Sequence, residues 1–111
     1  MIIKFVTTTL FLFLLCFSVY AFACEDDGDK EAGEARYNKS CINCHGPAGK
    51  GVASYPKISG QDVSYTKKKL ETYRKGIKIG PNSSLMIMMA RSLTDEEIAN
   101  LAAYLKDATY E

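Results

Sequence analysis

The stretch "SCINCHGPAGKG" (residues 40–51) decides how this chain folds. It contains Cys41 and Cys44, three positions apart, and directly after them His45, the single histidine of the chain. Residues i and i+3 lie about one helical turn apart on one face, so the two thiols reach two vinyl groups along one porphyrin edge and the imidazole lies beside the ring. C-x-x-C-H is typical of c-type haem attachment for this reason. We predict one haem c bonded to Cys41 and Cys44, with His45 on the iron.

Three other kinds of site use paired cysteines, and each fits this sequence less well. A structural zinc site takes four thiolate or imidazole ligands, and beside the motif the exported chain offers only Cys24, on a distant acidic segment. A thioredoxin-like pair begins a helix after a strand, whereas the approach "EAGEARYNKS" has no strand character. A plain disulfide between Cys41 and Cys44 would explain neither His45 nor the rest of the pattern.

Residues 1–23 have the features of a secretory signal peptide. Lys4 gives a positive start, "FVTTTLFLFLLCFSVY" an apolar stretch, and "AFA" the small-x-small cleavage pattern. A retained membrane anchor is the alternative, but the stretch is slightly short for a span of ~20 residues and no positive stop-transfer flank follows it. We predict export to the periplasm, which leaves one domain within residues 24–111.

We expect residues 24–29 to form an acidic N-terminal tether and residues 30–111 to form the haem domain. A domain this short buries a modest core and usually needs a disulfide, a metal or another prosthetic group. Cys24 directly follows the predicted cleavage site, as the lipid-bearing cysteine of bacterial lipoproteins does, although Ala21 and Phe22 match the usual preceding residues poorly. Contact with a membrane is therefore expected only if Cys24 is lipidated.

Three motifs in order resemble the class I c-type cytochromes, in particular the short bacterial monohaem cytochromes similar to one half of a dihaem cytochrome. They are "GEARYNKSCINCHGPAGKG", "YPKISGQDVSY" and "LMIMMARSLTDEEIANLAAYL", and the resemblance extends from about Lys30 to Asp107. It implies the all-α cytochrome c fold, with about three main helices and loops wrapped around one covalently bound haem. It also implies that the first and last helices cross at Gly33, against Tyr104.

The residue pattern agrees with an all-helical chain and contains no strand pattern. A first helix over about 29–40 brings Gly33, Tyr37 and Cys41 onto one stripe at i, i+4 and i+8. The segment 46–56, dense in glycine and proline, predicts a loop that wraps around the site.

Two further helices follow in the pattern. One is expected over about 62–75, before the glycine and proline residues of "KGIKIGPNSS". The other begins after Thr94, which forms a capping box with Glu97, and it is the clearest helix of the chain. The predicted apolar stripes are Val63, Leu70 and Tyr73 in the first of these helices and Ile98, Leu101, Ala102 and Leu105 in the second.

Haem iron has two axial positions, and His45 fills only one. Met86, Met88 and Met89 are gathered in a segment that we expect to be a loop ahead of the last helix. A run of methionines is more often core filling than a ligand set. Alignment with the Met-x-x-Met segment of the resembling family implies Met86 as the second ligand and Met89 as a packing residue. Met89 and then Met88 are the alternatives.

The resemblance also implies residues around the haem. Pro56 matches the proline whose backbone carbonyl accepts the proton on the far nitrogen of the proximal histidine, which fixes the ring and its basicity. Ile58, Gln61 and Tyr65 match positions that enclose the ring or its propionates. Ordinary loop and helix packing is the alternative for each of them.

Iron held by histidine and methionine has no open coordination site, and the thioether raises the reduction potential relative to a second imidazole. We therefore predict a one-electron carrier and no enzyme, because one histidine allows no Ser-His-Asp or Cys-His arrangement and no phosphate-binding glycine motif is present. Two alternatives stay open: the haem subunit of a larger periplasmic oxidoreductase, and a gas-binding or peroxidase-like haem protein whose methionine is weakly held.

The middle of the chain is basic, since between residues 36 and 91 only Asp62 and Glu71 are acidic. By contrast "CEDDGDKEAGE" is acidic, so the exported chain is near neutral and nucleic acid is not an expected ligand. We predict redox protein partners with an acidic docking surface, although scattered lysines often serve only solvation. The basic residues of the segment are Arg36, Lys39, Lys50, Lys57, Lys67, Lys68, Lys69, Arg74, Lys75, Lys78 and Arg91, of which Lys67 to Lys69 lie on the expected exposed flanks of the second helix.

Overall fold

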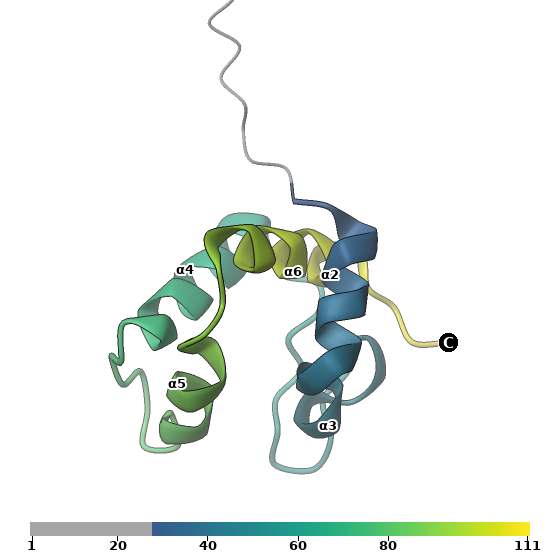
Figure 1. The fold of residues 1–111 in the computed structure, drawn as a ribbon. Helices are drawn as coiled ribbons and strands as arrows, with labels where there is room; N and C mark the ends of the chain where they lie inside the picture. Colours follow the sequence, from purple (N-terminus) through teal and green to yellow (C-terminus); the bar gives the residue numbers. More distant parts are fainter. Residues whose placement is uncertain (1–27) are drawn as a thin grey trace, which may run out of the picture.

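The computed structural model describes residues 28–111, which form an all-α body arranged as an arch (Figure 1). Within these residues the only extended pairing is an isolated bridge between Val52 and Tyr55. The predicted fold class is confirmed, whereas the predicted signal peptide and most of the predicted tether lie outside the described residues. The helical elements are α2 (Lys30–Arg36), the π-helical turn η1 (Tyr37–Cys41), α3 (Ile42–His45), the 3-10 turn η2 (Pro47–Gly49), α4 (Val63–Arg74), α5 (Ser84–Ala90) and α6 (Asp95–Asp107).

One leg of the arch is a continuous helical segment made of α2, η1 and α3. Asp29 begins it by accepting a hydrogen bond from the Ala32 amide at 3.0 Å. The segment does not end near Ser40 as predicted, but continues through a π-helical turn to His45. Such a turn inserts an extra residue into an α-helix and is frequent at functional sites. The complete C-x-x-C-H motif is therefore held on helical backbone.

Helix α6 spans the top of the arch, and its beginning is as predicted (Figure 1). The Thr94 hydroxyl accepts from the Glu97 amide at 3.1 Å, and the Glu97 carboxylate accepts from the Thr94 amide at 2.9 Å. This capping box satisfies two amides that would otherwise lack partners at the helix start. The predicted stripe of α6 is buried: Ile98, Leu101, Ala102 and Leu105 are at most 3% exposed.

The first and last helices cross at the predicted position. A Cβ carbon added to Gly33 would lie 2.9 Å from the Tyr104 Cβ carbon, closer than real side chains approach. The ring of Tyr37, one turn further along, lies 5.5 Å from the Tyr104 ring, centroid to centroid. The folded body begins before this crossing, because the amide of Asp29, placed in the tether by the sequence, donates to the Asn100 side chain at 2.7 Å.

Helices α4 and α5 make the other leg of the arch (Figure 1). Leu70 and Tyr73 of α4 pack against the core as predicted, but Thr66 is the buried residue of the helix and Val63 is only half-buried. The predicted methionine loop is wrong, because that segment forms α5. Ala90, only 1% exposed, fixes the end of α5 in the core, so packing stabilises a helix too short to form on propensity alone.

The wrapping loop after α3 returns beneath α6. The amides of Ile58 and Gly60 donate to the carbonyls of Gly49, at 2.9 Å, and Leu105, at 2.9 Å. Gly49 has a φ of +68°, and a Cβ carbon there would lie 2.9 Å from the Leu105 side chain. The loop therefore packs closely on the C-terminal half of α6. Between Gly28 and Glu111 no helix is long and apolar enough to cross a membrane.

Candidate haem site

A cavity of about 1040 Å³ lies between the two legs of the arch, with α6 as its roof. Small-molecule sites run from about 300 to 1,000 Å³, so this cavity is large enough for a porphyrin-sized group. Met88 is the one candidate residue from the sequence that does not line it. The residues predicted around the haem all line it: Cys41, Cys44, His45, Pro56, Ile58, Gln61, Tyr65, Met86 and Met89.

The two cysteines of the motif present free thiols to the cavity. Both are half-buried and come from adjacent turns of one helical segment. Burial raises the pKa of the Cys41 thiol, while the nearby Ser40 side chain and the Arg36 guanidinium partly oppose that rise. Cys41 therefore stays a neutral thiol at neutral pH, and both sulfur atoms are available for covalent attachment.

His45 is held in one orientation at the cavity wall and is only 7% exposed. Its Nδ1 atom lies 2.9 Å from the Pro56 carbonyl oxygen, which is the hydrogen bond expected from the resemblance. Since a carbonyl can only accept, Nδ1 carries the proton and donates it. The Nε2 atom then has the free lone pair that a metal needs.

The backbone on either side of this imidazole is also fixed. The Tyr37 hydroxyl, in a side chain that is fully buried, donates to the Gly46 carbonyl at 2.5 Å. The Gly51 amide donates to the His45 carbonyl at 2.8 Å. Burial raises the pKa of the Tyr37 hydroxyl to about 12, so it remains a donor at neutral pH.

The three methionines of α5 differ in what they face. Met86 is half-buried and lines the cavity, whereas Met89 lines it but is 44% exposed. Met88 is 63% exposed and does not line it. Two thioethers can therefore reach the cavity, and Met86 is the more enclosed of the two.

The rest of the wall is chemically suited to a porphyrin, which is a large apolar ring with two carboxylates. Arg36, Lys57 and Lys69 line the cavity, and none of the lining residues is acidic. The predicted exposed flank of α4 is only partly confirmed, because Lys68 is exposed while Lys67 and Lys69 are half-buried. The residues of the motif and of this wall thus fit a covalently bound haem.

Several wall residues were not identified as site residues from the sequence. Four apolar side chains (Leu70, Tyr73, Leu101 and Leu105) belong to stripes that the sequence predicts as core, and in this arch the core and the cavity wall are one surface. Leu93 belongs to neither stripe. Ser83 had no sequence signal beyond its place in a turn-rich segment. The unassigned wall residues include Leu70, Tyr73, Leu93, Leu101, Leu105 and Ser83.

Known proteins resemble this chain over nearly all of the described residues. The family model "Cytochrome c" matches residues 30–109. Cytochrome c-554(548) of Halomonas halodenitrificans is 44% identical over 78 residues, which are 69% of this chain and 93% of the relative. Cytochrome c4 of Thiocapsa roseopersicina is 41% identical over 78 residues, but these make up only 38% of that relative. A "Thiosulfate dehydrogenase electron acceptor" of Stutzerimonas stutzeri is 40% identical over 65 residues, 58% of this chain and 30% of that protein.

Solved structures show the same architecture. Reduced recombinant cytochrome c4 from Pseudomonas stutzeri matches with a TM-score of 0.65 and 27% identity, over 72% of this chain and 48% of that one. Cytochrome c4 of Acidithiobacillus ferrooxidans matches with a TM-score of 0.63 and 27% identity, over 69% and 48%. This chain thus spans about half of either cytochrome c4 chain. The family match and the C-x-x-C-H motif together mean that it binds haem c covalently. By sequence, fold and cavity, the chain belongs to the cytochrome c family.

Proposed function

We propose that the protein is an exported monohaem electron carrier in which His45 and Met86 are the axial ligands of the iron. The observation that carries this proposal is that both residues line the same cavity as the two free thiols of the motif. When bound, haem c supplies a reversible ferric–ferrous couple. A chain that fills both axial positions leaves no place for a substrate on the metal, so one-electron transfer is the chemistry that remains.

The surrounding residues would serve this function by fixing the ligands and excluding water. The Pro56 carbonyl keeps the imidazole of His45 in one tautomer and increases the basicity of Nε2. Ile58, Gln61 and Tyr65 would enclose the ring, and Met89 would pack beside it. We favour Met86 over Met89 as the ligand because it is the more enclosed, and a buried thioether competes better against water.

Optical spectra of both redox states, combined with an intact mass, test this proposal. The mass should include one haem that acid and organic solvent do not extract, and oxidised protein should have the far-red sulfur-to-iron band. Met86→Ala should remove this band and lower the reduction potential, whereas Met89→Ala should keep it. Met88→Ala is the matched control, because its side chain does not line the cavity. If Met89→Ala removes the band instead, the ligand lies one helical turn further along α5.

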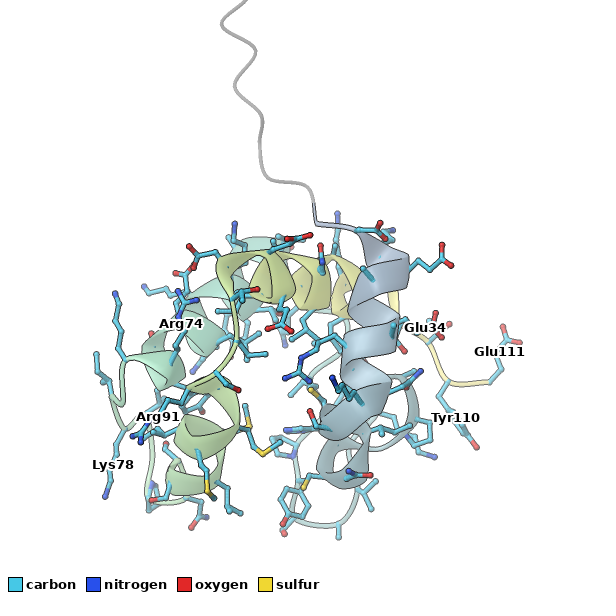
Figure 2. The ribbon with its side chains drawn as sticks, in the orientation of Figure 1. Glu34, Arg74, Lys78, Arg91, Tyr110 and Glu111 are labelled. Atoms are coloured by element: carbon cyan, nitrogen blue, oxygen red, sulfur yellow. The ribbon has the colours of Figure 1, made fainter. Side chains whose placement is uncertain are left out.

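We also propose where redox partners dock. The segment from Lys75 to Arg91 has no acidic residue. Figure 2 places Arg74, Lys78 and Arg91 on the α4–α5 side of the molecule, and Glu34 and Glu111 on the opposite side. An apolar centre with a basic rim suits a transient contact with an acidic partner. This α5 surface consists of the exposed apolar residues Ile77 and Met88, the exposed apolar residues Ile79, Leu85 and Met89, which also line the cavity, and the exposed basic residues Lys75, Lys78 and Arg91.

Two other functions are distinguished by simple measurements. A haem subunit of a larger oxidoreductase would copurify with its enzyme at high salt, and the relative named as a thiosulfate dehydrogenase electron acceptor makes a dehydrogenase a reasonable first partner to test. A gas-binding or peroxidase-like protein would bind carbon monoxide in the reduced state or give a high-spin spectrum. A free carrier should not copurify with an enzyme at high salt, should not bind carbon monoxide and should not give a high-spin spectrum.

The proposed export rests on the signal-like sequence of residues 1–23. The mass of protein recovered from the periplasm should correspond to a chain that begins at Cys24. Lipidation of Cys24 would add acyl chains to that mass and would move the protein into the detergent phase in a partition experiment. Fully aqueous behaviour would reject the anchor.

A further inference from the structure

Ser83 joins the loop after α4 to the beginning of α5. Its side chain is buried, with 5% of the residue exposed, and its hydroxyl oxygen accepts hydrogen bonds from the amides of Ile79, at 3.0 Å, and Gly80, at 2.8 Å. Its carbonyl accepts from the Ile87 amide at 2.9 Å, a bond of the first turn of α5. One residue therefore holds the loop with its side chain and the helix with its backbone.

Besides these bonds, two backbone hydrogen bonds hold the junction, from the Ser83 amide to the Gly80 carbonyl and from the Ile77 amide to the Thr72 carbonyl, each at 3.2 Å. Between Arg74 and Ser84 the chain forms neither helix nor strand, and its large apolar side chains, Ile77 and Ile79, are 53% and 42% exposed. Buried apolar area therefore contributes little to the position of the loop. Helix α5 has only seven residues, too few to be stable by itself. Burial of Ala90 fixes the end of α5, whereas the two hydrogen bonds to the Ser83 hydroxyl are the side-chain contacts that fix its beginning relative to the cavity.

We propose that Ser83 is the residue that positions Met86 for iron ligation. Met86 is the third residue of α5, and both it and Ser83 line the cavity. A shift of the first turn of α5 would move the Met86 thioether directly, whereas His45 is fixed by a different segment. The inference rests on the proposed ligation by Met86. It states that Ser83 determines how tightly Met86 is held on the iron.

The test is competition between Met86 and added imidazole in the oxidised haem protein, followed by loss of the far-red band. Ser83→Ala should bind imidazole about tenfold more tightly than wild type, because each lost hydrogen bond changes an equilibrium by roughly two- to tenfold. Ser83→Thr keeps the hydroxyl and should restore the wild-type affinity. Ser92→Ala is the matched control, since this serine just after α5 is exposed and does not line the cavity, and it should bind imidazole as wild type does.

A purely structural serine would give a different result. Ser83→Ala would then lower the unfolding midpoint and leave the imidazole affinity of the folded protein unchanged, which would overturn the inference. If Ser83→Ala yields no haem protein, amide exchange in wild type decides: displacement of Met86 by imidazole should increase exchange at Ile79 and Gly80 but not within α6. Unchanged exchange would reject the role of Ser83. A far-red band that persists in Met86→Ala would instead overturn the ligation itself.

Discussion

Gly33 of α2 lies so close to Asn100 of α6 that a Cβ carbon at Gly33 would be 2.0 Å from the Asn100 carbonyl oxygen. The side chain of the same Asn100 accepts a hydrogen bond from the Asp29 amide at 2.7 Å. The helical segment that carries the haem-binding motif is thus tied to the roof of the cavity by backbone contact. The atoms nearest to such a Cβ carbon are backbone atoms of Asn100 and the Cβ carbon of Tyr104, and none of them is the mobile end of a side chain that could absorb a change.

Gly33→Ala should therefore destabilise the haem protein by about 3 kcal/mol or more, near the upper end of overpacking penalties, because the helices must separate. The measurement is urea unfolding followed by far-UV circular dichroism.

The matched control is Glu34→Ala. Glu34 is the exposed neighbour of Gly33 on α2 and does not line the cavity, so this change should alter the free energy of unfolding by less than about 0.5 kcal/mol. Equal stability of the two variants would contradict the crossing described here.

Sequence reasoning succeeded where a local rule or a whole-family motif decided the structure. Thr94 and Glu97 predicted the start of α6 because a capping box depends only on neighbouring residues. The resemblance predicted the crossing of Gly33 with Tyr104 and the hydrogen bond from His45 to Pro56. These contacts join distant segments, and no periodicity within either segment contains them.

Sequence reasoning failed where packing overrides local preference. Helix α5 was predicted as a loop. Its seven residues, Ser84–Ala90, have too little intrinsic helicity to form a helix alone, and the burial of Ala90 decides their conformation. The π-helical turn Tyr37–Cys41 gave no sequence signal either, since it arises from fitting a helix to its surroundings. The role of Ser83 depends on a loop geometry that composition does not specify.

Tyr37→Phe removes the hydrogen bond to the Gly46 carbonyl but keeps the buried ring. At pH 8 the variant should be less stable than wild type by about 1 kcal/mol, the net contribution of one such bond. The difference should shrink above pH 10. There Tyr37 ionises in the unfolded chain but not in the folded protein, where its pKa is about 12. Ionisation therefore stabilises the unfolded state of the wild type, whereas the variant has no ionisable group at this position. Urea unfolding of both proteins between pH 8 and 11 measures this, and a constant difference would count against it.

Thr94→Ala removes the hydroxyl that accepts from the Glu97 amide and should cost about 1 kcal/mol of unfolding free energy, measured by thermal unfolding. Thr94→Ser keeps the acceptor and should stay near wild type. The pKa of the Glu97 carboxyl is lowered, first by the Thr94 amide and then by Arg36. Ionised Glu97 therefore stabilises the folded state at pH values above the ordinary pKa of a glutamate. This stabilisation should fade as the pH falls through the lowered pKa of Glu97 in the folded protein. A serine variant as unstable as the alanine variant would show that the hydroxyl is unimportant.

If electrons leave the protein at the α5 surface, the charge of this surface should set the rate at which small charged reagents oxidise the haem. Lys78→Glu combined with Arg91→Glu should slow oxidation of the reduced protein by hexacyanoferrate(III) several-fold at low salt and speed oxidation by a cationic cobalt(III) complex. Electrostatic steering changes association rates by ~10- to 1000-fold and weakens as ionic strength rises, so both effects should disappear at high salt. The matched control is Lys39→Glu combined with Lys106→Glu, which makes the same change in net charge at exposed residues of η1 and α6. Stopped-flow absorbance gives the rates, and unchanged spectra and potentials confirm that only encounter is affected. If the two double variants respond equally, net charge alone sets the rate and the α5 surface is not where electrons leave the protein.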